Sequence, residues 1–242
     1  MKTMKIKKPM KPISFWHRLL DLISPRLCVV CDSRLSAGEE VVCAKCHFHL
    51  PRTNFHLDPR DNEMARHFWH QIPVERATAY FYYEAHAATA RILYAMKYGG
   101  HPEIGEAMGR MMATEIQSSG FFEGIDVIIP VPLTVKRQRQ RGYNQSIEIA
   151  RGISAVTGIP VDHEVMSRIV FAESQTHKDR WARNDNVAGV FHCNAPATVS
   201  GRHVLLIDDV VTTGATLISC AQELMKSSDI RLSILTLGYA KS

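Results

Sequence analysis

Residues 203–217, HVLLIDDVVTTGATL, constrain the fold and the chemistry of this chain more than any other segment. The run HVLLI is apolar enough for a buried strand, and two adjacent acids, Asp208 and Asp209, follow it directly. Because ligands of open parallel sheets bind beyond the carboxyl ends of the strands, we expect these acids at the edge of a binding crevice. A capped helix after a strand, with solvated acids, would explain each residue alone but not the ordered combination.

The residues after the acids, VVTTGAT, are suited to a phosphate group. Gly214 permits a tight turn, and backbone amides and threonine hydroxyls at the start of a helix can bind a phosphate dianion. The two carboxylates can accept hydrogen bonds from the hydroxyls of a ribose and help to position magnesium. The segment therefore predicts a site for phosphoribosyl diphosphate with magnesium. Its expected members are Asp208, Asp209, Val210, Thr212, Thr213, Gly214, Ala215 and Thr216.

Helical and extended patterns alternate along most of the chain. Strand patterns cover residues 77–83, 126–132, 203–207 and 231–237. Helical patterns cover residues 87–98, 103–117, 146–156 and 215–226. This alternation predicts an α/β fold, with a parallel sheet covered by helices on both faces.

Four of the six cysteines form two CxxC pairs, namely Cys28, Cys31, Cys43 and Cys46. Each pair places two thiolates on one turn, and two such turns complete a tetrahedral shell that needs no water ligand. We therefore expect a structural zinc site in a ribbon over residues 26–52. Disulfides are the alternative, which the lack of a secretion signal disfavours.

The first 25 residues combine a basic stretch, MKTMKIKKPMKP, with a short amphipathic helical pattern. His17, Arg18 and Asp21 interrupt the apolar core that a signal peptide needs, and no apolar run reaches the roughly eighteen residues of a membrane helix. We expect a cytoplasmic protein with no membrane span. The formal net charge of +5 arises partly in this tail, which weakens a general argument for nucleic acid binding.

Residues 53–76 contain several prolines, asparagines and aspartates and show little periodicity. Such a composition is typical of loops, so we predict a linker here. The main domain is then expected over residues 77–242.

Basic side chains are needed for the pyrophosphate of the predicted ligand. One candidate ends the helical pattern at residues 87–98, and the others follow the predicted strand-end loop at residues 130–133. They are Lys97, Arg137 and Arg141, with Asn144 in the same polar run. A solvated basic helix is the alternative for the arginines.

The polar stretch at residues 175–184, QTHKDRWARN, precedes the predicted nucleotide strand. We expect it to form a mobile loop over the substrate, in which Arg180 and Arg183 cover the diphosphate.

The strand, the paired acids and the threonine and glycine loop resemble the signature of phosphoribosyltransferases. The resemblance extends to the ComF family of competence-associated proteins through the CxxC pairs and three further segments. These are LYAMKYG at 93–99, IPVPLTVKRQRQRGYNQS at 129–146 and RNDNVAGVF at 183–191. It covers residues 26–240 and implies a type I phosphoribosyltransferase core with a zinc ribbon, and a role in DNA uptake or the use of external DNA. Members often have a further CxxC pair, which is missing between Pro51 and Val74, so we expect one zinc ion.

Three functions agree with these features. The leading hypothesis is a transferase that displaces pyrophosphate from the anomeric carbon, with a nucleobase as a candidate acceptor. Asp208 and Asp209 would then hold the ribose and oppose positive charge on its ring, while Arg180 and Arg183 would cover the leaving group. The alternatives are a non-catalytic module that senses the same ligand, and an adaptor that binds single-stranded DNA or a competence helicase through the ribbon, the tail and the RQRQR stretch.

Overall fold

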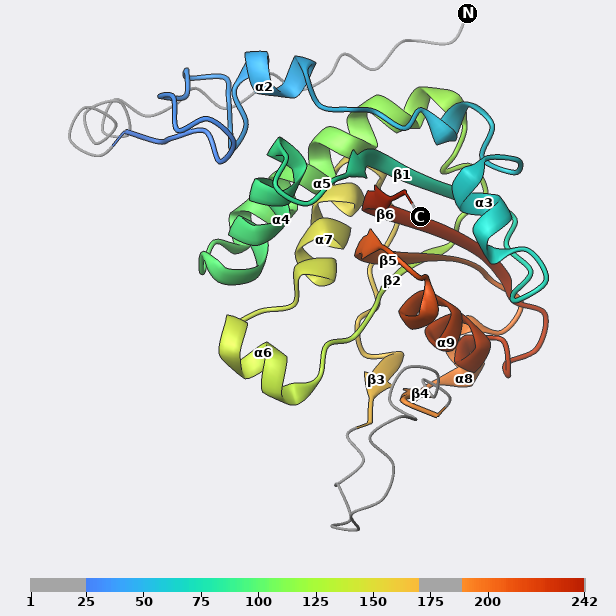
Figure 1. Cartoon of the computed structure of the whole chain (residues 1–242). Coiled ribbons are helices and arrows are strands. Elements are labelled where there is room, and N and C mark those ends of the chain that lie inside the picture. The colour runs from blue at the N-terminus through green and yellow to red at the C-terminus, as the bar shows by residue number, and fades with distance from the viewer. Residues whose placement is uncertain (1–24, 170–188, 242) are drawn as a thin grey trace, which may run out of the picture. The chain divides into compact units, whose positions relative to one another are not determined.

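The computed structural model describes residues 25–169 and 189–241 (Figure 1). The chain divides into two compact units between Phe48 and His49. The smaller unit contains the four clustered cysteines, and the larger one contains all the named strands.

The small unit is a pair of turns followed by a short helix, α2 (Ala44–Phe48). Glu39 joins the turn before α2 to the helix itself, because its carboxylate accepts hydrogen bonds from the amides of Ser36 and Ala44, each at 2.6 Å. These backbone donors stabilise the ionised form and lower the pKa of the Glu39 carboxyl. The carboxylate therefore caps the helix that follows Cys43.

Four parallel strands form the central sheet of the larger unit. Their spatial order is β1 (Arg76–Tyr83), β6 (Arg231–Ala240), β5 (His203–Val211) and β2 (Val127–Pro130). Each pair of neighbours is parallel. The four predicted strands are thus present, and their near-continuous apolar sequences fit a sheet that is buried on both faces.

Strand β5 extends beyond the two acids, whereas the sequence predicts its end at residue 207. The neighbouring strand β6 continues to Ala240, so Asp208 lies opposite Thr236 and Val210 lies opposite Gly238. These additional ladder partners keep Asp208 and Asp209 in extended backbone. The loop after the strand therefore begins at Thr212.

Helices cover both faces of the sheet (Figure 1). One face bears α4 (Ala88–Tyr98), α5 (Pro102–Ile116) and α7 (Gln145–Thr157), and the other bears α9 (Ala215–Leu224) and α3 (Glu63–Phe68). On the α9 face, Val204 and Leu206 of β5 pack in one cluster with Leu217 and Leu224. The predicted α/β fold is confirmed.

Two glycines bring α5 and α7 unusually close together. A Cβ on Gly109 would lie 2.2 Å from the carbonyl oxygen of Ile149, and one on Gly152 would lie 2.0 Å from that of Glu106. No other residue fits at either position without moving a backbone. This contact fixes α7, whose first turn reaches the carboxyl ends of the strands.

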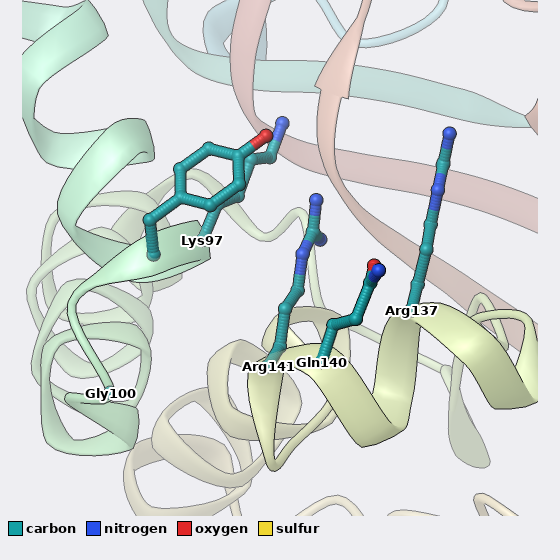
Figure 2. A pocket seen from close by; sticks show the side chains of 6 residues that line it. Lys97, Gly100, Arg137, Gln140 and Arg141 are labelled. Atoms are coloured by element: carbon teal, nitrogen blue, oxygen red, sulfur yellow. The ribbon is translucent and has the colours of Figure 1, made fainter.

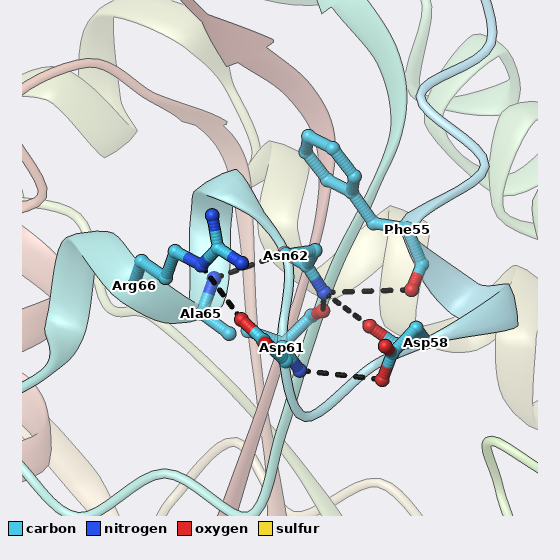
Figure 3. Close-up of polar contacts among 7 residues, drawn as sticks. Phe55, Asp58, Asp61, Asn62, Ala65 and Arg66 are labelled. Atoms are coloured by element: carbon cyan, nitrogen blue, oxygen red, sulfur yellow. Dashed lines mark hydrogen bonds and ion pairs between the residues drawn. The ribbon is translucent and has the colours of Figure 1, made fainter.

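The stretch predicted as a linker is part of the folded core. It contains a 3-10 turn, η1 (Phe55–Leu57), and helix α3, and it buries Met64 and Phe68 completely. Asn62 joins α3 to β1. Its Oδ1 accepts from the Ala65 amide at 2.9 Å (Figure 3), and its Nδ2 donates to the Ala77 carbonyl at 2.9 Å.

The boundary of the small unit also differs from the predicted ribbon end at residue 52. The Pro51 carbonyl accepts from the Tyr82 amide at 2.8 Å, and the Thr53 amide donates to the Tyr80 carbonyl at 3.3 Å. Residues 51–53 therefore pair with β1 and belong to the larger unit.

The remaining elements are short. They are η2 (Gln117–Ser119), α6 (Val135–Arg141), α8 (Pro196–Val199) and an antiparallel pair, β3 (Met166–Arg168) and β4 (Phe191–Cys193). In the part of the chain that the structure describes, no helix is both long and apolar enough to cross a membrane.

Candidate functional site

Asp208 and Asp209 lie side by side near the carboxyl end of β5, in different surroundings. Asp208 Oδ1 accepts a hydrogen bond from Ser146 Oγ at 3.0 Å and one from the Asp209 amide at 2.9 Å. Burial, together with the charge of Asp209, raises the pKa of Asp208 to about 7. Asp209 is 9% exposed, and its Oδ2 lies 3.0 Å from Lys97 Nζ.

A cavity of about 140 Å³, called the site cavity below, surrounds the two acids. It combines the end of β5 with the loop after β2, the end of α4, the helices α6 and α7, and β3. Its lining residues are Lys97, Val131, Pro132, Leu133, Arg137, Arg141, Gln145, Arg168, Asp208, Asp209, Val210 and Thr216. Four cations and two carboxylates thus share one small space.

Lys97, Arg137 and Arg141 also line a larger hollow of about 690 Å³, together with Tyr98, Gly100 and Gln140. Figure 2 shows the side chains of Arg137, Gln140 and Arg141 rising from α6 toward the same open space as Lys97. Arg141 donates to Gln145 Oε1 at 2.8 Å. The basic residues predicted from the sequence therefore converge beside the acids.

The predicted phosphate loop connects β5 to α9. Gly214 has a φ of 71°, and it directly precedes the first residue of α9. A Cβ at this position would lie 2.9 Å from His67 Nε2, so the turn requires glycine. The first helical hydrogen bond of α9 runs from the Ile218 amide to the Gly214 carbonyl. The amides before Ile218 have no acceptor within the helix itself, and a helix N-terminus of this kind attracts anions.

The predicted members of the loop differ in position. Val210 and Thr216 line the site cavity with the acids. Thr212 and Thr213 are exposed, and neither they nor Gly214 and Ala215 are among the described residues that line that cavity. The loop thus forms an open turn next to the cavity.

Asn144 is 4% exposed and lies behind the cavity wall. Its Oδ1 accepts from the Ser146 amide at 3.0 Å, and its Nδ2 donates to the Val131 carbonyl at 3.0 Å. Because both ends of the side chain bind backbone, Asn144 positions the start of α7 and does not line the cavity.

Arg180 and Arg183, the predicted diphosphate-covering residues, lie outside the described residues.

The four cysteines of the small unit come together as predicted. Their sulfur atoms lie within 4.8 Å of one another, and the Sγ atoms of Cys31 and Cys43 are 3.7 Å apart. A tetrahedral ion with a metal–sulfur distance of about 2.3 Å requires sulfur–sulfur edges of roughly 3.8 Å. The cluster is therefore able to bind a metal ion of zinc's geometry.

Thiol ionisation within the cluster is uneven. Hydrogen bonds from Ser33 lower the pKa of Cys31 to about 6. Burial and the neighbouring thiols raise the pKa of Cys46. The protein environment therefore favours the thiolate at Cys31 and the neutral thiol at Cys46.

Comparison with known proteins identifies the family to which the larger unit belongs. The sequence matches the family model described as "Phosphoribosyl transferase domain" over residues 98–237, which is more than half of the chain. The chain belongs to this family. The matched range includes α6, α7, β5 and the loop to α9, and so most of the site cavity.

Relatives of this phosphoribosyltransferase-domain protein carry competence and DNA utilization names. It is 29% identical to "DNA utilization protein YhgH" of Shigella flexneri over 204 residues, covering 83% of this chain and 85% of that protein. It is 24% identical to "Competence protein ComFC" of Bacillus subtilis (strain 168), covering 83% and 89%. The predicted membership of the ComF family is confirmed.

A solved structure with some likeness is the glutamine phosphoribosylpyrophosphate (PRPP) amidotransferase from B. subtilis complexed with ADP and GMP. The TM-score is 0.39, the identity is 19%, and the likeness covers 58% of this chain and 30% of that chain.

Sequence reasoning missed three residues of the ComF protein's site. Arg168 at the end of β3 lines the site cavity, where burial and the charge of Arg137 lower its pKa while Asp208 raises it. Ser146 binds Asp208, and His67 Nε2 lies 2.9 Å from the Thr213 carbonyl oxygen. Ser146 belongs to the RGYNQS run, so the sequence offered a signal for it. No motif marks Arg168 or His67.

Proposed function

We propose that this ComF family protein binds phosphoribosyl diphosphate with magnesium in the site cavity and transfers the phosphoribosyl group to an acceptor. One observation carries the proposal, namely that four cations and two carboxylates line a single cavity next to a helix N-terminus. A molecule with a ribose, a 5-phosphate and a diphosphate offers matching groups to each of these.

The cations would bind the diphosphate. Lys97, Arg137 and Arg141 come from two helices and Arg168 from β3, so they approach from separate sides. Gln145 supports the same role, because its Nε2 is buried and has no hydrogen-bond partner among the described residues. A buried amide donor without a partner costs stability, and a ligand oxygen would satisfy it.

The acids would bind the ribose hydroxyls, and the turn from Thr212 to Thr216 would bind the 5-phosphate through amides and hydroxyls. In the transfer, the bond between the anomeric carbon and the diphosphate oxygen breaks, and the acceptor's nucleophilic atom forms a new bond to that carbon. Pyrophosphate leaves with the bonding electrons, and positive charge develops on the ribose ring. The carboxylates of Asp208 and Asp209 would stabilise that positive charge, while the cations would stabilise the leaving group.

The donor set suits magnesium, because two adjacent carboxylates supply the oxygen ligands that this hard cation prefers. Burial and the neighbouring charge of Asp209 raise the pKa of Asp208, and a bound cation would favour its ionised form. Bound magnesium would neutralise charge on the leaving diphosphate.

Transfer is distinguished from ligand sensing by pyrophosphate release. The protein, phosphoribosyl diphosphate and magnesium are incubated with single nucleobases or ammonia, and release is compared with that of the Asp208→Asn/Asp209→Asn variant. Acceptor-dependent release that the variant lacks supports the transferase. Ligand binding with no release across all acceptors would leave the non-catalytic module as the function.

We also propose that the cysteine cluster binds one structural zinc ion, because four thiols and the 3.7 Å spacing suit a closed tetrahedral shell. The relatives' names further suggest a role in DNA uptake or utilization, with single-stranded DNA or a competence helicase as a partner. A nucleobase remains the candidate acceptor of the transferase.

A further inference from the structure

A very short connection joins α6 to α7 beside the site cavity. Helix α6 ends before Gly142, which has a φ of 81° and donates its amide to the Gln138 carbonyl at 2.8 Å, and α7 begins after its cap, Asn144. Only Tyr143 separates these two caps, so both helix ends restrict its backbone. Residues 143–146, called the YNQS turn below, therefore have a well-defined position next to the cavity.

Tyr143 extends from the YNQS turn to the end of α4. Its hydroxyl donates to the Met96 carbonyl at 2.6 Å. Met96 lies in the last turn of α4, where a carbonyl oxygen has no amide donor further along the helix. Burial raises the pKa of Tyr143, so the hydroxyl keeps the proton that it donates. The bond therefore fixes the backbone directly before Lys97.

Ser146 extends from the same turn to β5. It is 2% exposed, and its hydroxyl donates to Asp208 Oδ1 at 3.0 Å. The Asp209 amide donates to the same oxygen at 2.9 Å. Among the described residues, no hydrogen bond reaches Asp208 Oδ2. The two donors thus hold the carboxylate by one oxygen and leave the other for a ligand in the site cavity.

We propose that Tyr143 and Ser146 are positioning residues of the site. Tyr143 holds Lys97 where its ammonium contacts the diphosphate, and Ser146 holds Asp208 with Oδ2 toward the ribose hydroxyls. Neither Tyr143 nor Ser146 is among the described residues that line the site cavity, so each acts through the residue that it holds.

Such positioning strengthens binding because a charged side chain that is already in place loses little freedom when the ligand arrives. The inference rests on the proposed function, since it names the residues that set the geometry of that site. One turn of the chain thus orders a cation for the diphosphate and an acid for the ribose.

The role of Tyr143 is tested by a double-mutant cycle, with calorimetric titration of the full-length protein in the presence of magnesium. Tyr143→Phe removes only the hydroxyl and weakens binding of phosphoribosyl diphosphate about threefold. It leaves binding of ribose 5-phosphate unchanged, because Lys97 contacts only the diphosphate. In the Lys97→Gln background, Tyr143→Phe has no further effect. Tyr80→Phe is the matched control, since the Tyr80 hydroxyl also donates a 2.6 Å hydrogen bond, to Glu115 Oε1.

The role of Ser146 is tested with two substitutions of nearly equal shape. Ser146→Thr keeps a hydroxyl and binds both ligands like the unaltered protein. Ser146→Val lacks the hydroxyl and weakens binding of both phosphoribosyl diphosphate and ribose 5-phosphate about fivefold, because both contain the ribose that Asp208 contacts. Ser233→Ala is the matched control, since Ser233 is another buried serine, with its hydroxyl 2.9 Å from His203 Nε2.

Unchanged affinity of Tyr143→Phe, or an equal loss with and without Lys97, overturns the role of Tyr143. Equal affinity of Ser146→Thr and Ser146→Val overturns that of Ser146. Circular dichroism of each variant identifies loss of folding, and Ser146→Ala, which adds no volume, decides the result if the larger side chains do not fit. No binding by the unaltered protein refutes the proposed function as well, whereas normal binding with additive effects refutes only the positioning.

Discussion

Lys97 Nζ lies 3.0 Å from Asp209 Oδ2, which joins the last turn of α4 to the end of β5. The two side chains are 24% and 13% exposed, so water screens their attraction only in part. The pair keeps a cation beside the acids before any ligand arrives. It also stabilises the ionised form of Asp208, whose pKa would otherwise rise further.

Replacing Lys97 by glutamine is expected to weaken binding of phosphoribosyl diphosphate about tenfold, because a charge-assisted contact to the diphosphate is lost. Calorimetric titration with magnesium present measures the change. Lys226→Gln is the control. This exposed lysine follows α9 and forms an ion pair with Glu223, and neither residue lines the site cavity. If both variants bind like the unaltered protein, Lys97 has no part in the ligand site.

The raised pKa of Asp208 predicts a pH-dependent cost to the ligand-free fold. The folded state retains this proton up to about pH 7, whereas the unfolded chain releases it near the ordinary value of 3.8. The folded state therefore binds more protons between these values, and its stability falls as the pH rises through that window. Asp208→Asn removes the cost and is expected to stabilise the ligand-free protein by about 2 kcal/mol at pH 8.

Urea unfolding of both proteins at pH 5 and pH 8 checks this expectation. The advantage of Asp208→Asn should grow toward pH 8, while the same variant loses affinity for phosphoribosyl diphosphate. A stability difference that is equal at the two pH values would show that ionisation of Asp208 is not the cause.

His67 is expected to position the phosphate loop from outside it. Its Nε2 lies 2.9 Å from the Thr213 carbonyl oxygen, so a proton on Nε2 makes it a hydrogen-bond donor. His67→Ala should weaken binding of ribose 5-phosphate about fivefold, whereas His67→Gln, with its amide donor, should recover part of the loss. The control is His192→Ala, an exposed histidine on β4. An unaffected His67→Ala variant would mean that the loop holds its shape without this contact.

The cysteine cluster is expected to contain one zinc ion per chain. Cys46→Ser should abolish it and unfold the small unit, because a structural zinc site contributes folding free energy directly. Cys193→Ala, outside the cluster, should keep the metal. Atomic emission of the purified proteins gives the stoichiometry, and limited proteolysis reports on the small unit. Zinc retained in Cys46→Ser would require a different ligand set.

The sequence predicted the parts of this fold that have strong local signals. The four strands are apolar runs, and Gly158, just beyond α7, takes the left-handed conformation of a helix cap, with a φ of 75°. The acids and the basic residues of α6 were found because parallel strands end at a common edge. Lys97 was assigned to the site from the LYAMKYG motif alone.

Features that depend on tertiary contacts were not predictable. Helix α3 is too short to show a 3.6-residue period, and Asn62 fixes it through the distant Ala77 carbonyl. Strand β5 continues past Ile207 only because β6 does. Arg168 enters the site cavity from a three-residue strand whose partner, β4, follows residues 170–188. Sequence periodicity does not predict which distant segments pair in this way.

The central claim is that the site cavity binds phosphoribosyl diphosphate with magnesium, and calorimetric titration of the full-length protein tests it most directly. The unaltered protein should bind with measurable heat, and more weakly when magnesium is omitted. Asp208→Asn/Asp209→Asn should lose at least about tenfold in affinity, because both ribose contacts and the magnesium ligands change. Equal affinity of the two proteins, or no binding by the unaltered protein, would contradict the assignment.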